Sequence, residues 1–99
     1  METLKNLLQQ VLSGYAGEAL NGYSYLTSDA ANNIFTVVSV GDVRGQRVVD
    51  TGLVVRVLPD QIVIERDVND KPLVEALVQA GIPRHQIVLA YSGEAASQK

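Results

Sequence analysis

Residues 52–91 read GLVVRVLPDQIVIERDVNDKPLVEALVQAGIPRHQIVLAY, and this stretch decides the fold. It contains the end of a long apolar run at 48–58 and two shorter runs at 61–66 and 87–91, each of which predicts a strand. A Pro-Asp pair between the first two runs predicts a tight turn, because proline presets the backbone dihedral of the first central position. The last run is almost continuously apolar, which is typical of a buried central or parallel strand.

A helix is predicted between the last two of these strands. Residues 67–70 include side chains that cap a helix N-terminus, and Pro72 suits the first turn because its missing N–H loses no partner there. Gly81, reinforced by Pro83, predicts the end of the helix. A helix that links two strands in this way predicts a right-handed βαβ crossover over 61–91.

The first half of the chain predicts another helix and further strands. Apolar residues recur at helical spacing over 4–15, with polar side chains on the other face. Strands are predicted at 23–27 and 34–40. The segment 28–33, rich in Asp and Asn, predicts a turn, because these residues tolerate left-handed dihedrals. The glycine-containing segment 41–47 is expected to be the next connection.

These elements together predict an α+β domain. It has an N-terminal helix, about four antiparallel strands, a second helix and a final strand, with both helices packed on the sheet. The long strand is expected to bend or bulge near Thr51 and Gly52, where glycine permits a kink. We expect one domain over 1–99, with a flexible tail at 92–99 because that segment is small and polar.

Composition limits the functional class. The chain has 99 residues, of which 46% are hydrophobic, which predicts one aliphatic core. The absence of cysteine excludes disulfides, thiolate metal sites and cysteine nucleophiles. The sequence shows neither a signal peptide nor a run of about 20 apolar residues, so we expect a cytoplasmic protein with no membrane partner. The net charge of −3 argues against direct nucleic-acid binding through phosphate neutralisation.

Residues that carry chemistry are sparse. Residues 67–78 begin like a calcium loop, but Pro72 replaces the required glycine and Val78 replaces the final glutamate. The glycines form neither a phosphate-binding loop nor a dinucleotide fingerprint. His85, the only histidine, lies in the loop before the last strand without an identifiable base or metal-ligand partner. We therefore predict no enzymatic activity, no catalytic residues, no metal and no cofactor.

The arginines are the remaining candidates for a binding site. Five of the eight cations are arginine, whose side chain makes bidentate contacts with carboxylates and phosphates: Arg44, Arg47, Arg56, Arg66 and Arg84. Arg56 interrupts an apolar run, and alternation places it on one face with Val54 and Leu58. With His85, the five arginines are the predicted partner-binding residues, pairing with acidic groups of a partner. The alternative is a solvated sheet face.

Four segments follow one another in a recognisable order. They are an Asp/Asn turn with the aliphatic strand after it (29–41), an Arg-Val pair (47–48), a Gly-Leu-Val-Val strand start (52–55), and a helix end with its Gly-Ile-Pro loop and final strand (77–91). In order and spacing they resemble the XisI-like proteins, a family named for a cyanobacterial factor that controls excision of the fdxN DNA element. The resemblance spans most of residues 7–91.

The sequence departs from the pattern of that family at four positions. Asp42 and Val63 stand where the family often has Trp, and Arg56 and Leu58 stand where it usually has His and Asp. The hairpin at the Pro-Asp turn is also shorter. A family function that depends on those groups would be altered in this chain, whereas the sheet and helices do not depend on them.

The resemblance implies a regulatory, non-catalytic accessory protein. Its expected partner is a protein similar to XisH, which has a nuclease fold, and its expected role is the control of DNA rearrangement or of that nuclease. Homo-oligomerisation, as a dimer through the first helix or an exposed sheet edge, is a further expectation.

Two other functions stay open from the residues alone. A direct DNA-binding module would need the five arginines to converge on one face despite the acidic total. A small-ligand-binding protein or enzyme would need a sheet pocket around Arg56, Arg66 and His85, and no substrate for it can be named.

Overall fold

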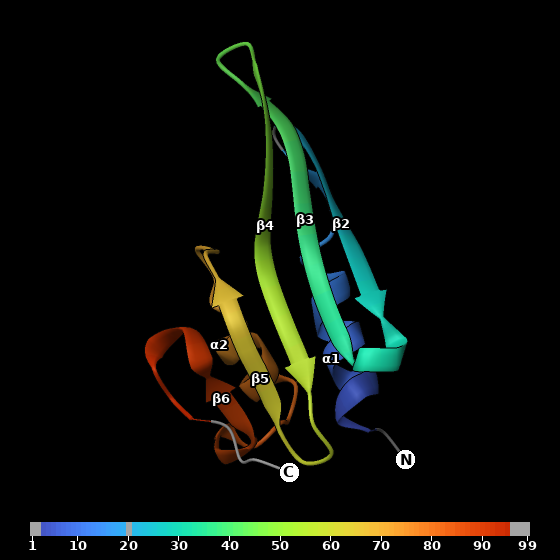
Figure 1. Cartoon of the computed structure of the whole chain (residues 1–99), viewed down its shortest axis with the longest axis vertical. Helices are drawn as coiled ribbons and strands as arrows, with labels where there is room; N and C mark the ends of the chain where they lie inside the picture. The colour runs from blue at the N-terminus through green and yellow to red at the C-terminus, as the bar shows by residue number, and fades with distance from the viewer. Residues whose placement is uncertain (1–2, 20, 96–99) are drawn as a thin grey trace.

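The computed structural model describes residues 3–19 and 21–95. In this part of the chain, six strands form one sheet in the order β1-β2-β3-β4-β5-β6 (Figure 1). The strands are β1 (Gly17–Ala19), β2 (Gly22–Asp29), β3 (Ile34–Val43), β4 (Gln46–Val57), β5 (Ile62–Asp67) and β6 (Ile87–Leu89). The helices are α1 (Leu4–Ser13) and α2 (Leu73–Gln79), with short 3-10 helices η1 (Ala30–Asn32), η2 (Arg84–Gln86) and η3 (Ala90–Ser92).

Both helices cover the same face of the sheet. The core cluster combines Leu8 and Leu12 of α1 and Leu73 and Leu77 of α2 with alternate residues of the strands, namely Phe35, Val37, Leu53, Val55, Ile62, Ile64 and Ile87. Each of these side chains is nearly or fully buried, and β3, β4 and β5 contribute every second residue because successive side chains point to opposite faces. Two helices on one face of a mixed sheet confirm the predicted α+β class.

The number and length of the strands differ from the prediction. The sheet has five antiparallel strands before the helix rather than about four, because the unpredicted β1 pairs with the start of β2. Strands β3 and β4 run through most of the expected connection at 41–47, so that only Arg44 and Gly45 form the turn. Both residues have positive φ, 53° and 79°, which is the geometry of the tight hairpin turns whose twist matches the sheet.

The predicted irregularity near Gly52 is confirmed. Val37 of β3 pairs with Leu53 of β4, whereas the next residue, Val38, pairs with Thr51. Gly52 is therefore the extra residue of a β-bulge, which bends the long strand where it leaves the body of the domain.

The β5-α2-β6 unit has the predicted order, and β6 is parallel to β5. β6 forms one edge of the sheet, so its apolar sequence reflects a parallel strand and not a central one. Asp67, at the end of β5, holds the start of α2, because its carboxylate accepts hydrogen bonds from the Leu73 N–H at 2.7 Å and from the Asn69 N–H at 3.0 Å. Pro72 lies at the N-cap, one position before the predicted first turn.

The two helices are also joined by a polar contact. The Tyr15 hydroxyl donates to the Lys71 carbonyl at 2.9 Å and so links the segment after α1 to the segment before α2. Burial, followed by the negative charges of Asp67 and Glu75, raises the pKa of Tyr15 above its ordinary value of 10.0, so the hydroxyl keeps its donor proton.

The flexible tail over 92–99 stays a prediction. Within that segment, Ser92 ends η3, Gly93 has a left-handed conformation, and Glu94 contacts the body of the domain. Residues 96–99 lie outside the described residues.

Candidate protein-interaction site

Part of the sheet projects beyond both helices. The upper ends of β2, β3 and β4 extend past α1 and α2 in Figure 1, and the described chain is 45 Å long but only 29 and 27 Å in its other dimensions. We call this projection the arm and define it as residues 22–25 of β2 together with residues 38–51 of β3, the hairpin turn and β4. No helix lies over the arm in Figure 1, and its outer part, residues 42–50, is exposed.

The arm carries an unusual share of exposed apolar surface. Within residues 3–19 and 21–95, five of the eight large hydrophobic side chains classed as exposed belong to it: Tyr23, Tyr25, Val43, Val48 and Val49. Their exposed fractions run from 42% for Tyr23 and Val48 to 64% for Val49. Exposed apolar side chains that lie close together are typical of interaction surfaces, so the arm is the candidate site.

The open face, meaning the face of the sheet opposite the helices, brings part of this cluster together. The strand register places Tyr23 beside Val40 and Val40 beside Val49, while Tyr25 pairs with Val38 in the next row. The rings of Tyr23 and Tyr25 lie 4.7 Å apart between centroids. The open face of the arm therefore offers aromatic rings flanked by valines, a composition that is enriched in protein-binding surfaces.

The opposite face of the arm is hollowed. A shallow depression of ≈ 180 Å³ lies there, and the paired glycines Gly22 and Gly41 and the neighbouring Val48 contribute to its lining. Gly22 is required for this close strand approach, because a Cβ atom at this position would lie 2.0 Å from the Val40 carbonyl oxygen. The depression is open and apolar, and it lacks the convergent polar groups that a small-ligand site needs.

Four of the five predicted arginines are engaged by acidic residues of the same chain. The ion pairs are Arg47–Asp42 at 3.3 Å, Arg56–Glu65 at 2.7 Å, Arg66–Asp50 at 3.6 Å and Arg84–Glu94 at 3.2 Å. Arg66 also donates from Nε to the Thr51 carbonyl at 2.7 Å. These four guanidinium groups hold neighbouring segments together instead of converging on one site.

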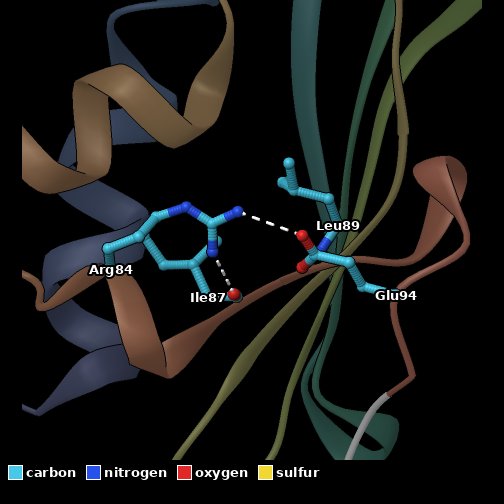
Figure 2. Close-up of polar contacts among 4 residues, drawn as sticks. All are labelled: Arg84, Ile87, Leu89 and Glu94. Carbon is cyan, nitrogen blue, oxygen red and sulfur yellow. Dashed lines mark hydrogen bonds and ion pairs between the residues drawn. The ribbon is translucent and has the colours of Figure 1, made fainter.

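Arg84 belongs to a clasp at the C-terminal end of the described chain (Figure 2). Its guanidinium donates to the Ile87 carbonyl at 2.7 Å and to the Glu94 carboxylate, and the other oxygen of Glu94 accepts from the Leu89 N–H at 2.8 Å. The Leu89 N–H, more than the Arg84 guanidinium, holds the pKa of Glu94 below its ordinary value of 4.5. His85, next to Arg84 in η2, is exposed, and η2 leads directly into β6, which is separated from the arm strands β2 to β4 by β5 in the sheet.

Arg44 stands apart from the other arginines. It forms the hairpin turn at the tip of the arm with a φ of 53°, a conformation that an L-residue with a long side chain adopts at a cost of about 1–2 kcal/mol. Its guanidinium makes no ion pair with the described residues.

Other chemistry is sparse in the described residues. No group of three or more His, Cys, Asp or Glu side chains in 3–19 and 21–95 is gathered closely enough to hold a metal ion. In the same residues, no helix has the length and apolar character needed to cross a membrane.

Comparison with known proteins identifies the relationship. The family described as XisI protein matches residues 1–99, the whole sequence. The chain belongs to the XisI family. No curated protein sequence matches it.

Two solved structures of the family share the fold. A XisI-like protein from Anabaena variabilis ATCC 29413 superposes with a TM-score of 0.65 at 23% identity, over 87% of this chain and 78% of the other. The fdxN element excision controlling factor XisI from the same organism gives a TM-score of 0.65 at 20% identity, over 88% of each chain. The resemblance inferred from segment order is thereby confirmed for the family and the fold.

The positions that depart from the expected XisI pattern have local structural roles. Arg56 is tied to Glu65, and Asp42 is tied to Arg47 at the tip of the arm. Val63 is 1% exposed and pairs with Val88 outside the main core cluster. These three residues therefore make contacts within the sheet in this member of the family.

The sequence reasoning missed the apolar part of the arm. It predicted partner contacts from arginines, whereas Tyr23, Tyr25 and Val49 carry the exposed apolar surface of the open face. The alternating tyrosines of β2 were the signal that could have identified it, since an aromatic residue at every second position places both rings on one face.

Proposed function

We propose that this chain is a non-catalytic accessory protein that acts in control of DNA element excision by binding a protein partner, a nuclease-fold protein of the XisH kind. The observation that carries the proposal is the arm, where Tyr23, Tyr25 and Val49 are exposed on a sheet that no helix covers. Membership of the XisI family supports the regulatory role, because one member of known structure is described as an excision controlling factor.

The charges of the chain favour a protein partner over DNA. Four arginines are already paired with carboxylates, and the net charge is −3. Direct phosphate binding would require those pairs to break, and the acidic total would oppose it. Arg44 at the tip remains available to meet an acidic group of a protein partner at the rim of an apolar contact.

The test is co-expression of the tagged chain with the XisH-like protein encoded in the same genome. We expect a stoichiometric complex that survives size-exclusion chromatography. Tyr25→Asp should abolish it, because the substitution places a charge in the centre of the open face. Val78→Asp is the matched control, since Val78 is a comparably exposed apolar residue, 43% against 51%, on α2 instead of the arm.

Substitutions of Arg44 give a second and independent test. Arg44→Asn removes the charge while keeping a residue that tolerates the positive φ, and it should weaken the complex severalfold. Arg44→Lys keeps both the charge and the strain, and it should bind nearly as well as the natural chain. Failure to recover the XisH-like protein with the unmodified chain, or equal loss with Tyr25→Asp and Val78→Asp, would reject the proposed function.

A further inference from the structure

One edge of strand β4 is not paired with any described strand along residues 46–50. The strand is hydrogen-bonded to β3 along its length, but β5 pairs with it only from Leu53 to Val57. Along residues 46–50 the other side of the strand therefore faces solvent, and Figure 1 shows β4 running up the arm with no strand on its outer side.

The turn geometry identifies which backbone groups face that edge. Val43 and Gln46 close the two-residue turn, and in such a hairpin the closing pair exchanges hydrogen bonds across the strands. Direction alternates along a strand, so Gln46, Val48 and Asp50 bond to β3 while Arg47 and Val49 direct their N–H and C=O groups outward. The Thr51 carbonyl, next in the outward series, accepts from Arg66 at 2.7 Å, which agrees with this assignment.

This edge carries only one of the features that keep exposed strands from pairing, the charged side chains of Arg47 and Asp50. Natural edge strands are protected by charged side chains, especially Lys, by Pro, by bulges or by a covering element. Residues 46–50 read Gln-Arg-Val-Val-Asp, with neither Lys nor Pro, and the bulge at Gly52 lies beyond them. Val48 and Val49 are both exposed there, at 42% and 64%. Because Arg47 and Asp50 are each paired with a charge of the same chain, at 3.3 and 3.6 Å, the exposed valines and the free backbone groups leave this edge as a template for another strand.

We propose that two copies of this chain join through residues 46–50 of β4, antiparallel about a two-fold axis at Val48, to form one continuous sheet. A two-fold axis perpendicular to the sheet puts the open faces of both copies on the same side of the joined sheet. Directly opposite residues must therefore lie on the same face, so an even-numbered residue meets an even-numbered one and an odd-numbered residue an odd-numbered one. Val48 then meets Val48 of the second copy, Arg47 meets Val49, and Gln46 meets Asp50.

The axis at Val48 fits the side chains better than the neighbouring alternative. An axis at Val49 would place Val48 against the Asp50 carboxylate and would use the Thr51 carbonyl, which Arg66 already occupies. With the axis at Val48, the Gln46 amide can donate to the Asp50 carboxylate, whose contact with Arg66 at 3.6 Å is longer than the 2.7 Å bond from Arg66 to Thr51. The two Val48 side chains meet beside the glycine-lined depressions of both copies, since the register sets Gly22, Gly41 and Val48 in one row.

This inference goes beyond the proposed function, because its occupant is a second copy of the chain and its residues are the strand edge. The open-face tyrosines remain exposed on both copies of the pair. Each dimer would therefore present two equivalent surfaces for the protein partner, related by the two-fold axis.

Charge swapping at the axis tests the proposal. Val48→Glu and Val48→Lys each place like charges against one another at the axis, so each variant alone should sediment in analytical ultracentrifugation as one chain, half the mass of the unmodified protein. An equimolar mixture of the two should return to the mass of a dimer, because Glu then faces Lys. A monomeric unmodified chain, dimeric single variants, or a mixture that stays monomeric would each overturn the proposal.

A backbone variant gives the matched control. Val49→Pro removes only an outward N–H and leaves the ladder to β3 intact, so it should give a folded monomer, whereas Val49→Thr keeps the N–H and should remain a dimer. Circular dichroism checks that each variant is folded. A capture experiment with the XisH-like protein distinguishes the dimer from the proposed function. If the monomeric Val48→Glu variant still captures the XisH-like protein, the dimer edge and the partner surface are separate sites. If the unmodified chain is a dimer but captures no partner, only the proposed function is rejected.

Discussion

Asp67→Ala is the substitution that most directly tests how the second half of the domain is held together. α2 has only seven residues, and its N-cap is Pro72, which has no side-chain acceptor. The Asp67 carboxylate supplies the acceptors from the end of β5, bonding to the Leu73 N–H at 2.7 Å and to the Asn69 N–H at 3.0 Å. Removing it leaves two backbone donors without their partner.

The size of the effect follows from those two bonds. Loss of a helix-capping acceptor costs about 1–2 kcal/mol, and loss of a net hydrogen bond in the turn costs about 1 kcal/mol. The free energy of unfolding should therefore fall by roughly 2–3 kcal/mol. For a domain of this size, that corresponds to a decrease in Tm of about 10–20 °C, measurable by circular dichroism.

Asp70→Ala is the matched control for this prediction. Asp70 lies three residues further along in the same loop, and its side chain makes no hydrogen bond or ion pair with the described residues. Its removal should change stability by no more than about 0.5 kcal/mol. Asp67→Asn, which keeps one acceptor oxygen, should fall between the two. Equal Tm values for Asp67→Ala and Asp70→Ala would refute the assignment of Asp67 as the cap of α2.

Three further predictions follow from the arm and the C-terminal clasp. Arg44→Asn should raise the free energy of unfolding by about 1 kcal/mol in urea titration, because Asn-Gly is preferred where both turn residues have positive φ. Gly22→Ala should lower it by about 1–3 kcal/mol in the same assay, because a Cβ would lie 2.0 Å from a carbonyl oxygen of β3. The pKa of Glu94 is lower in the folded than in the unfolded chain, so its stabilising contribution is present above pH 4.5 and is lost as the pH falls through the folded value. Glu94→Gln should abolish that part of the pH dependence, and the protection of the Leu89 N–H from hydrogen exchange, relative to the intrinsic rate at each pH, should fall on acidification in the unmodified chain only.

The body of the domain was predictable where the residues constrain the backbone strongly. Gly81 has a φ of 105° after α2, which explains why a glycine ends that helix. Gly52 provides the bulge in β4, and Asn33 adopts the left-handed conformation expected of the Asp/Asn turn. At Gly81 and Asn33 the left-handed backbone favours one residue type for a local steric reason, so no knowledge of distant contacts was needed.

The arm was not predictable because the role of Gly41 depends on a contact between two strands that are distant in the sequence. Gly41 and Gly45 in sequence indicate a loop, yet Gly41 lies inside β3 because it faces Gly22 across the ladder. The turn itself was hidden because Arg44 is a poor match for a position with positive φ. From the local sequence alone, a glycine at a close approach of two strands cannot be distinguished from a glycine in a loop. Only the register between β2 and β3 shows the difference.

The ion pairs show the same limit for the candidate site. Arg56 and Glu65 are nine residues apart and belong to different strands, so only the β4–β5 register brings them to 2.7 Å. The arginines therefore looked available in the sequence although most of them are paired within the fold. The exposure of an apolar residue cannot be predicted from its identity either. Val48 and Val55 are both valines in β4, yet Val48 is 42% exposed and Val55 is 0% exposed.

The strain at Arg44 connects the stability of the chain to its proposed role. An Asn at this position would stabilise the turn, so the natural residue leaves about 1 kcal/mol of available stability unused. Stability alone gives no reason for an arginine at the tip of the arm. A variant that is more stable but binds the partner less well would separate these two demands, because one substitution would move the free energy of unfolding and the affinity in opposite directions.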